Sequence, residues 1–104
     1  CMDAFAFARR RFGAPVAVLV NNAGVALAGN ESVSLTVGVN LVGLIRCATL
    51  ALADFRDAEG CGEGVILNIA SVAGLGPVPA SPVYAASKHG VVGWTRSCKG
   101  LYGP

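Results

Sequence analysis

The chain has 104 residues and a net charge of +2, and 54% of its residues are hydrophobic while only 13% are charged. Because a short chain exposes most of its surface, this apolar composition predicts faces that other parts of a protein cover. The small net charge argues against a nucleic-acid partner, which favours a strongly basic surface.

The four cysteines, at positions 1, 47, 61 and 98, form no Cys-x-x-Cys pair and show no metal-ligand spacing. We therefore expect no metal site, and we expect reduced thiols in a cytoplasmic protein. Residues 64–87 carry no charge, but prolines interrupt them at positions 77, 79 and 82. Prolines at this density argue against a spanning helix, so we expect no membrane span.

The first half of the chain predicts a helix, a strand and a long helix. Residues 5–12 are typical of a helix that Gly13 ends. Residues 16–20 are continuously apolar, as in a strand buried on both faces of a parallel sheet. Apolar residues then recur at steps of four and three, which predicts one amphipathic helix over residues 33–55. Its apolar stripe consists of Val33, Val37, Leu41, Leu44, Ala48, Leu52 and Phe55.

The second half repeats this pattern. Residues 57–64 form a polar loop, residues 65–70 a second buried strand, and residues 82–97 a third helix with a proline in its first turn. The glycines and the terminal proline of residues 98–104 do not continue a helix. Helices that alternate with buried strands predict an α/β fold with a doubly wound parallel sheet.

Polar residues follow both predicted strands directly. Asn21, Asn22, Ala23 and Gly24 come after the first strand, and Ser71 comes after the second. Open α/β sheets bind ligands at the carboxyl ends of their strands, so we expect a site there. Taken alone, the Asn-Asn-Ala-Gly run and Ser71 are also compatible with ordinary turns.

Two side chains of the third helix add candidate chemistry. Tyr84 and Lys88 are four residues apart, which places them on one helix face. A lysine ammonium stabilises a phenolate, strongly only where the pair is sheltered from water. Asn40 lies beside the apolar stripe of the long helix, where an amide is costly unless it is hydrogen-bonded or reaches water. An exposed tyrosine–lysine pair and a boundary asparagine are the plain alternatives.

Together, Asn40, Ser71, Tyr84 and Lys88 resemble the active site of the short-chain dehydrogenase/reductase family, with Ser71 thirteen positions before Tyr84. The segment Pro-Val-Tyr-Ala-Ala-Ser-Lys-His-Gly at residues 82–90 resembles the NAD-dependent 15-hydroxyprostaglandin dehydrogenase branch of that family. The resemblance covers residues 5–97. It implies a Rossmann-like fold and hydride transfer between a secondary alcohol or ketone and NAD, with NADP still open.

The resemblance also implies residue roles. Ser71 donates a hydrogen bond to the substrate oxygen, Tyr84 exchanges its proton, and Lys88 assists Tyr84 and binds the nicotinamide ribose. The backbone of Asn40 helps to hold a water in the proton relay. The backbone at Asn22, Ala23 and Gly24 passes close to the cofactor ribose.

Two features depart from the family pattern. Position 81 holds a serine where the prostaglandin enzymes have a substrate-contacting glutamine, so Ser81 is a candidate substrate contact with an altered preference. A complete enzyme has roughly 250 residues and begins with a glycine-rich cofactor-binding turn that this chain lacks. We therefore interpret residues 1–104 as the central portion of one catalytic domain, without the N-terminal glycine-rich unit and the C-terminal strands.

Three functional interpretations follow. The first is an NAD-dependent alcohol dehydrogenase, a homodimer in its full-length form, whose 104-residue portion is inactive alone. The second is an NADPH-dependent carbonyl or oxoacyl reductase of the same superfamily. The third is a truncated, non-catalytic product.

Overall fold

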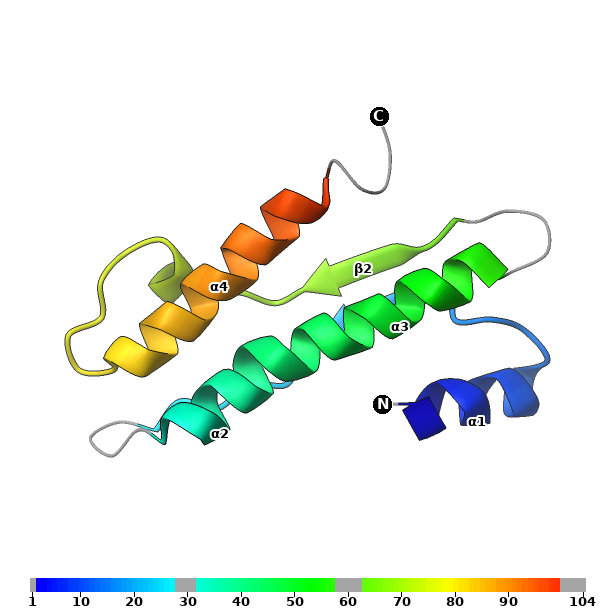
Figure 1. Cartoon of the computed structure of the whole chain (residues 1–104), viewed down its shortest axis with the longest axis horizontal. Helices are drawn as coiled ribbons and strands as arrows, with labels where there is room; N and C mark the ends of the chain where they lie inside the picture. Colours follow the sequence, from blue (N-terminus) through cyan, green and yellow to red (C-terminus); the bar gives the residue numbers. More distant parts are fainter. Residues whose placement is uncertain (1, 28–31, 58–62, 100–104) are drawn as a thin grey trace.

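In the computed structural model, the chain folds into parallel strands with connecting helices (Figure 1). The structure describes residues 2–27, 32–57 and 63–99. The elements in chain order are α1 (Met2–Phe12), β1 (Val18–Asn21), α2 (Val33–Val37), the π-helix η1 (Gly38–Gly43), α3 (Leu44–Asp57), β2 (Val65–Asn68), the 3₁₀-helix η2 (Val72–Gly74) and α4 (Pro82–Cys98). This order confirms the predicted alternation of helices and strands. Within the predicted loop, residues 58–62 lie outside the described residues, as do residues 100–104 of the predicted tail.

The strands pair in parallel, as predicted, with Val18 opposite Val65 and Asn21 opposite Asn68. The ladder continues where the Ile69 N–H donates to the Asn21 carbonyl at 3.0 Å. β1 begins two residues later than expected and includes Asn21. The first asparagine of the polar run therefore belongs to the strand, and the loop begins at Asn22.

A π-helical insertion changes which face of the long helix is buried. The sequence stripe runs through Val33 and Val37, yet Val33 is 63% exposed, while Thr36 and Asn40 are fully buried. A π-helix has a wider turn than an α-helix, so η1 displaces the buried face by one residue. From Leu44 onward the buried positions return to the predicted stripe or its neighbour, at Leu44, Ala48, Ala51 and Phe55.

Thr36 shows what this displacement costs. Its hydroxyl is buried, and it has no hydrogen-bond partner among the described residues. An unpaired buried hydroxyl destabilises a protein by about 1–3 kcal/mol. The same displacement also buries Asn40, but the amide of Asn40 makes all of its hydrogen bonds.

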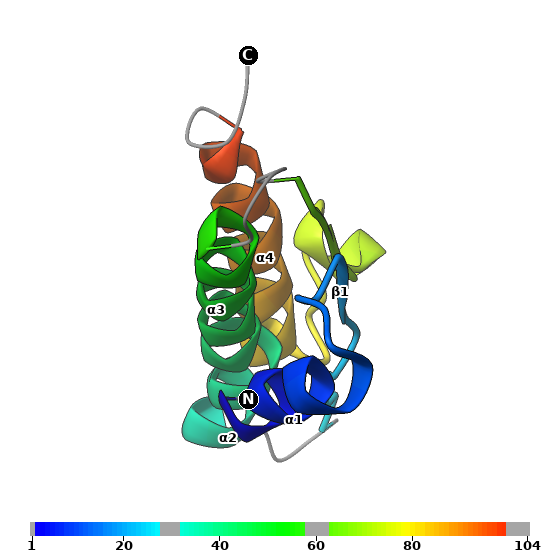
Figure 2. The same ribbon diagram turned by 90° about the vertical axis from the view of Figure 1, so that its right-hand side faces the viewer.

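The helices cover one face of the sheet. α3 contacts both strands, and Figure 2 shows α3 and α4 on one side of β1. On the opposite face, Val18, Val20, Val65 and Leu67 are each 51–59% exposed. The prediction that both strand faces are buried is therefore wrong for the described residues. The radius of gyration of 15.3 Å exceeds the ~13 Å typical of a complete 100-residue domain, as expected for one layer of helices on a sheet.

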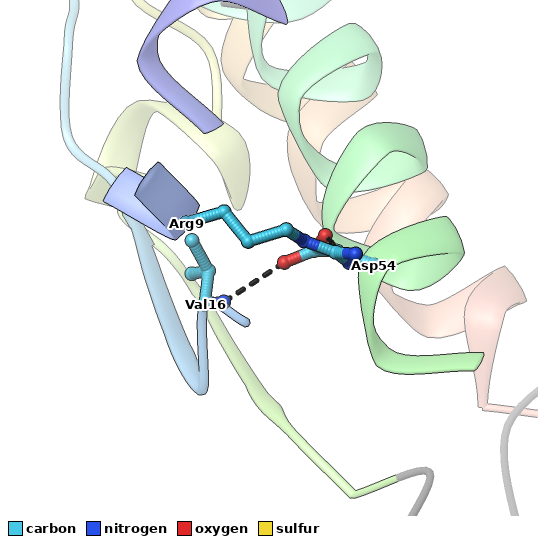
Figure 3. Close-up of polar contacts among 3 residues, drawn as sticks. All are labelled: Arg9, Val16 and Asp54. Atoms are coloured by element: carbon cyan, nitrogen blue, oxygen red, sulfur yellow. Dashed lines mark hydrogen bonds and ion pairs between the residues drawn. The ribbon is translucent and has the colours of Figure 1, made fainter. Parts of the chain in front are cut away.

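A carboxylate on α3 connects α1 to the start of β1 (Figure 3). Asp54 forms an ion pair with Arg9. It also accepts a hydrogen bond from the Val16 N–H at 2.8 Å. α1 ends at Gly13, whose positive φ of 66° suits glycine at a helix C-terminus. Asp54 thus holds the chain where it turns from α1 into the sheet.

The helical run Val33–Arg56 is long and apolar enough, by length and composition alone, to cross a membrane. A core helix meets the same criterion. Arg46 lies in the middle of the run, where a charge is costly in hydrocarbon. One side of the run also packs against α4 and the sheet, so we interpret it as a core helix.

The two cysteines whose bonding state the structure gives differ. Cys98 is a free thiol, and partial burial raises its pKa, which keeps it protonated at neutral pH. Cys47 is disulfide-bonded. The expectation of reduced thiols is therefore wrong for Cys47, because cysteine spacing does not reveal which thiols a fold brings together.

The exposed apolar sheet face predicts that the isolated 104-residue chain self-associates. Val20→Lys combined with Leu67→Lys should increase the monomer fraction measured by sedimentation velocity, because charges on strands oppose association. The control is Phe12→Lys, which places the same charge at a side chain that is 72% exposed at the end of α1. A monomeric wild-type chain that unfolds cooperatively would contradict this prediction.

Candidate active site

Asn40 is a fully buried amide that binds the loop after β1. Its Oδ1 accepts from the Val25 N–H at 2.7 Å, and its Nδ2 donates to the Val25 carbonyl at 2.9 Å. Nδ2 also donates to the Ser87 hydroxyl at 3.0 Å. The alternative of a boundary asparagine touching water is therefore wrong. The bonds of Asn40 join η1, the loop after β1 and α4.

Lys88 is also buried, with only 4% of its surface exposed. Its Nζ donates to the carbonyl of Ile69, just after β2, at 3.0 Å. The same nitrogen lies 5.8 Å from the centroid of the Tyr84 ring. Ile69 takes one of the three N–H donors of an ammonium. The lysine thus connects α4 to the carboxyl end of β2 and stands over the phenol ring.

Tyr84 is half-buried on α4, one turn before Lys88. The predicted shared face of the two side chains is confirmed by the position of Nζ over the ring. A cation within about 6 Å of an aromatic centroid is attracted to the ring. The exposed-pair alternative is excluded for Lys88 by its burial.

Ser71 follows β2 and caps the short helix η2. Its Oγ accepts from the Ala73 N–H at 3.1 Å. A hydroxyl that accepts one bond still has its own proton to donate. Ser71 therefore fulfils a turn role and keeps a donor for a ligand oxygen.

Asn21 links the two strands through its side-chain amide. Its Nδ2 donates to Asn68 Oδ1 at 2.9 Å and approaches the Leu44 carbonyl at 3.4 Å. Asn68 in turn donates to the Thr95 hydroxyl at 3.0 Å. The amides of the two strands are thereby tied to each other and to helices α3 and α4.

Asn22, Ala23 and Gly24 are exposed beyond the carboxyl end of β1. A Cβ at Gly24 would lie 3.5 Å from Asn40 Oδ1 and 3.6 Å from Lys88 Nζ, which are ordinary contact distances. Packing within the chain therefore does not require a glycine here. Gly24 does place the loop directly against Asn40 and Lys88.

Ser81 and His89 occupy different surroundings on α4. Ser81 is 8% exposed at the start of the helix, and its side chain forms no capping hydrogen bond. His89 is exposed, and its Nδ1 lies 2.9 Å from the Ala85 carbonyl one turn earlier. The ring of His89 thus bonds within its own helix and is exposed to solvent.

Ser87 and Gly74 lie close to these side chains, although the sequence pattern did not mark either residue as functional. Ser87 is 1% exposed and bonded to Asn40. Gly74 lies so close to α4 that a Cβ would be 2.8 Å from the Lys88 carbonyl. The Tyr-x-x-Ser-Lys spacing alone placed a serine beside Lys88, but nothing local indicated its partner.

Among residues 2–27, 32–57 and 63–99, no group of three or more His, Cys, Asp or Glu side chains is placed to hold a metal ion. Parallel strands that alternate with helices, with polar residues beyond their carboxyl ends, are typical of the Rossmann-like α/β fold. A family model of short chain dehydrogenases matches residues 1–104, and the chain belongs to this family.

Two curated relatives and one solved structure illustrate the similarity. The NAD(+) 15-hydroxyprostaglandin dehydrogenase of Rattus norvegicus is 50% identical over 82 residues, covering 77% of this chain and 29% of the relative. Alcohol dehydrogenase 1 of Ceratitis capitata is 49% identical over 80 residues, which cover 76% of this chain and 30% of that relative. The structure of ElxO with NADP bound is 28% identical, with a TM-score of 0.83 over 96% of this chain and 42% of that chain. The chain thus spans less than a third of the length of these curated relatives.

The close approach of η2 to α4 predicts that Gly74→Ala impairs activity in a full-length enzyme. The added methyl would meet the Lys88 carbonyl, which as backbone cannot move aside, so η2 and the adjacent Ser71 must shift. A shift of ~1 Å near a reacting group can cost about 10²-fold in rate. Steady-state kinetics should show a lower kcat, while Gly76→Ala, where no atom lies within 4 Å, should leave kcat unchanged. Equal kcat values for the two variants would contradict the prediction.

Proposed function

We propose that this chain is the central part of a catalytic domain that transfers a hydride between a secondary alcohol and NAD. The observation that carries the proposal is the buried Lys88 ammonium, which lies over the Tyr84 ring and beside Gly24 at the carboxyl edge of the sheet. A structural role alone would not require an ammonium in so sheltered a position, since burying a charge is costly. Membership of the short chain dehydrogenase family supports this interpretation.

The residues present fit a nicotinamide cofactor. Because Gly24 has no Cβ, no side chain of the loop after β1 covers Lys88 Nζ and Asn40 Oδ1 at this position. Asn22, Ala23 and Gly24 are themselves exposed. We propose that Lys88 and this backbone hold the ribose, while the cofactor supplies the hydride acceptor. The rat relative is named for NAD(+), which favours NAD, whereas the NADP bound to ElxO keeps NADP as the alternative.

The side chains divide the acid–base work. Tyr84 accepts the proton of the substrate hydroxyl as the alcohol is oxidised. Lys88 stabilises the phenolate from its position over the ring. Ser71, whose Oγ accepts from the Ala73 N–H, donates a hydrogen bond to the substrate oxygen. Asn40 holds the loop after β1 in place, with its backbone as the proposed anchor of a relay water.

We propose an apolar substrate, such as a hydroxylated lipid. Val72 and Leu75, which follow Ser71 closely, are 86% and 70% exposed, and apolar side chains beside a site favour an apolar ligand. The relative from Rattus norvegicus is named for a hydroxyprostaglandin and that from Ceratitis capitata for alcohol. Ser81 replaces a longer glutamine of the prostaglandin branch, and its hydroxyl makes no capping hydrogen bond, so we propose it as a substrate contact with broader tolerance.

We propose that this chain belongs to a larger protein. We propose that residues 1–104 are one partial domain, that a glycine-rich unit and further strands complete it, and that the 104-residue chain is inactive alone. The share of 29% of the rat enzyme supports this interpretation. We further propose a cytoplasmic homodimer without a membrane span.

Two other functions remain as outcomes of the tests. An NADPH-dependent carbonyl or oxoacyl reductase would use the same four side chains, and the similarity to NADP-bound ElxO favours it as the second candidate. A truncated, non-catalytic product would have only a binding or dimer-forming role. Steady-state assays of the full-length protein with NAD and with NADPH separate the first two functions, and the length of the natural transcript tests the third.

Tyr84→Phe in the full-length enzyme should lower kcat for alcohol oxidation by about 10²–10⁴-fold, the contribution typical of a general acid or base. The ring that lies below Lys88 is retained, so NAD affinity should change little. NADH absorbance measures the rate, and fluorescence titration measures the affinity. His89→Gln, an exposed change on the same helix, is the control. If Tyr84→Phe retains most of the wild-type kcat, the assigned role is wrong.

Ser81→Gln tests the substrate proposal. A longer amide reaches further into the site, so kcat/KM for prostaglandin E2 should rise relative to simple secondary alcohols, by the factor of about 2–10 that one neutral hydrogen bond provides. Both substrates should be assayed with the wild type and the variant. A wild type that already strongly prefers the prostaglandin, with no change in the variant, would show that position 81 does not control specificity.

A further inference from the structure

Ser87 is a polar side chain for which the proposed reaction provides no role. It is 1% exposed on α4, between Tyr84 and Lys88. A serine inside a helix commonly bonds to a carbonyl of the preceding turn and needs no further partner. Ser87 does form such a bond, because its hydroxyl donates to the Tyr84 carbonyl at 2.7 Å. It also has a second partner, from a different element.

The second partner is Asn40, and the direction of every bond in this chain of contacts follows from the end groups. The Val25 N–H is only a donor, so it must meet the Asn40 oxygen, which leaves the Asn40 Nδ2 facing Ser87 as a donor. The Tyr84 carbonyl is only an acceptor, so Ser87 must donate to it. Ser87 therefore accepts from Asn40 and donates within α4, and no alternative orientation satisfies all four groups.

These bonds give α4 two anchors on successive residues. Lys88 is bonded to Ile69 after β2, and Ser87 is bonded through Asn40 to Val25 after β1. Adjacent residues on a helix project about 100° apart. Two anchors in different directions fix the rotation of α4 about its axis as well as its position. That rotation decides where the phenol of Tyr84 and the ammonium of Lys88 point.

We propose that Ser87 is a positioning residue that couples the helix carrying Tyr84 and Lys88, through Asn40, to the loop after β1. This inference rests on the proposed function for its catalytic consequence, although the coupling itself is a property of the fold. Ser87 contacts neither substrate nor cofactor in this proposal. Its effect on the reaction comes through the positions of Tyr84 and Lys88 on α4.

The test compares Ser87→Ala, Ser87→Thr and Ser97→Ala in the full-length enzyme. Ser97 is the matched control, because its exposed hydroxyl also bonds within α4, to the Gly93 carbonyl at 2.8 Å. Ser87→Ala should lower kcat by about 10–100-fold, as expected for a misplaced catalytic group, while KM changes by less than about threefold. The pH profile of kcat should also shift to higher pH in Ser87→Ala, because Lys88 then stabilises the Tyr84 phenolate less well. Ser87→Thr restores the hydroxyl and should recover most of the rate and the original profile.

A readout independent of activity is hydrogen exchange at the Val25 amide, which Asn40 protects. Ser87→Ala should accelerate this exchange by about tenfold, the factor for one hydrogen bond, and Ser97→Ala should not. Unchanged exchange together with an unchanged pH profile in Ser87→Ala would overturn the proposal. If Ser87→Ala does not fold, Ser87→Cys takes its place, and wild-type kcat and exchange in that variant would equally overturn it. Faster exchange in a protein that oxidises no alcohol would support the coupling and reject the proposed function.

Discussion

The buried amide of Asn40 is the interaction on which the site depends. It takes both backbone groups of Val25 and the hydroxyl of Ser87, so one side chain joins the loop after β1 to α4. An amide at zero exposure is tolerable only when its bonds are made. The π-helix η1 makes this possible, because it turns Asn40 toward the site, while the buried Thr36 hydroxyl has no hydrogen-bond partner among the described residues. π-helical turns are often found at functional positions.

Lys88 forms the second link, from α4 to the end of β2. A long side chain that is 4% exposed must give up conformational freedom and hydration, so its retention calls for a compensating interaction. The Ile69 carbonyl and the Tyr84 ring provide part of this compensation. A bound anionic or hydroxyl-rich ligand would provide the rest. The burial of Lys88 beside Tyr84 thus agrees with the short chain dehydrogenase family to which the chain belongs.

The sheet sets a different constraint. Its helix-covered face holds the site, while Val18, Val20, Val65 and Leu67 leave the other face apolar and exposed. Parallel sheets normally have both faces covered. The apolar composition of the chain is explained by this face, which the proposed larger domain would cover. The coupling of α4 to both strand ends is nevertheless complete within the described residues.

The sequence by itself determined the order of helices and strands, the parallel sheet, and the placement of Ser71 and the Asn-Asn-Ala-Gly run at strand ends. It also placed Tyr84 and Lys88 on one helix face. These features follow from local periodicity, which each segment carries alone. Only the tertiary structure decided that η1 displaces the buried face onto Thr36 and Asn40, and that Ser87 bonds to Asn40 across 47 positions. The displaced face is stabilised by the bonds of Asn40 to α4 and to the loop after β1. Those partners are distant in the sequence, so no local pattern contains them.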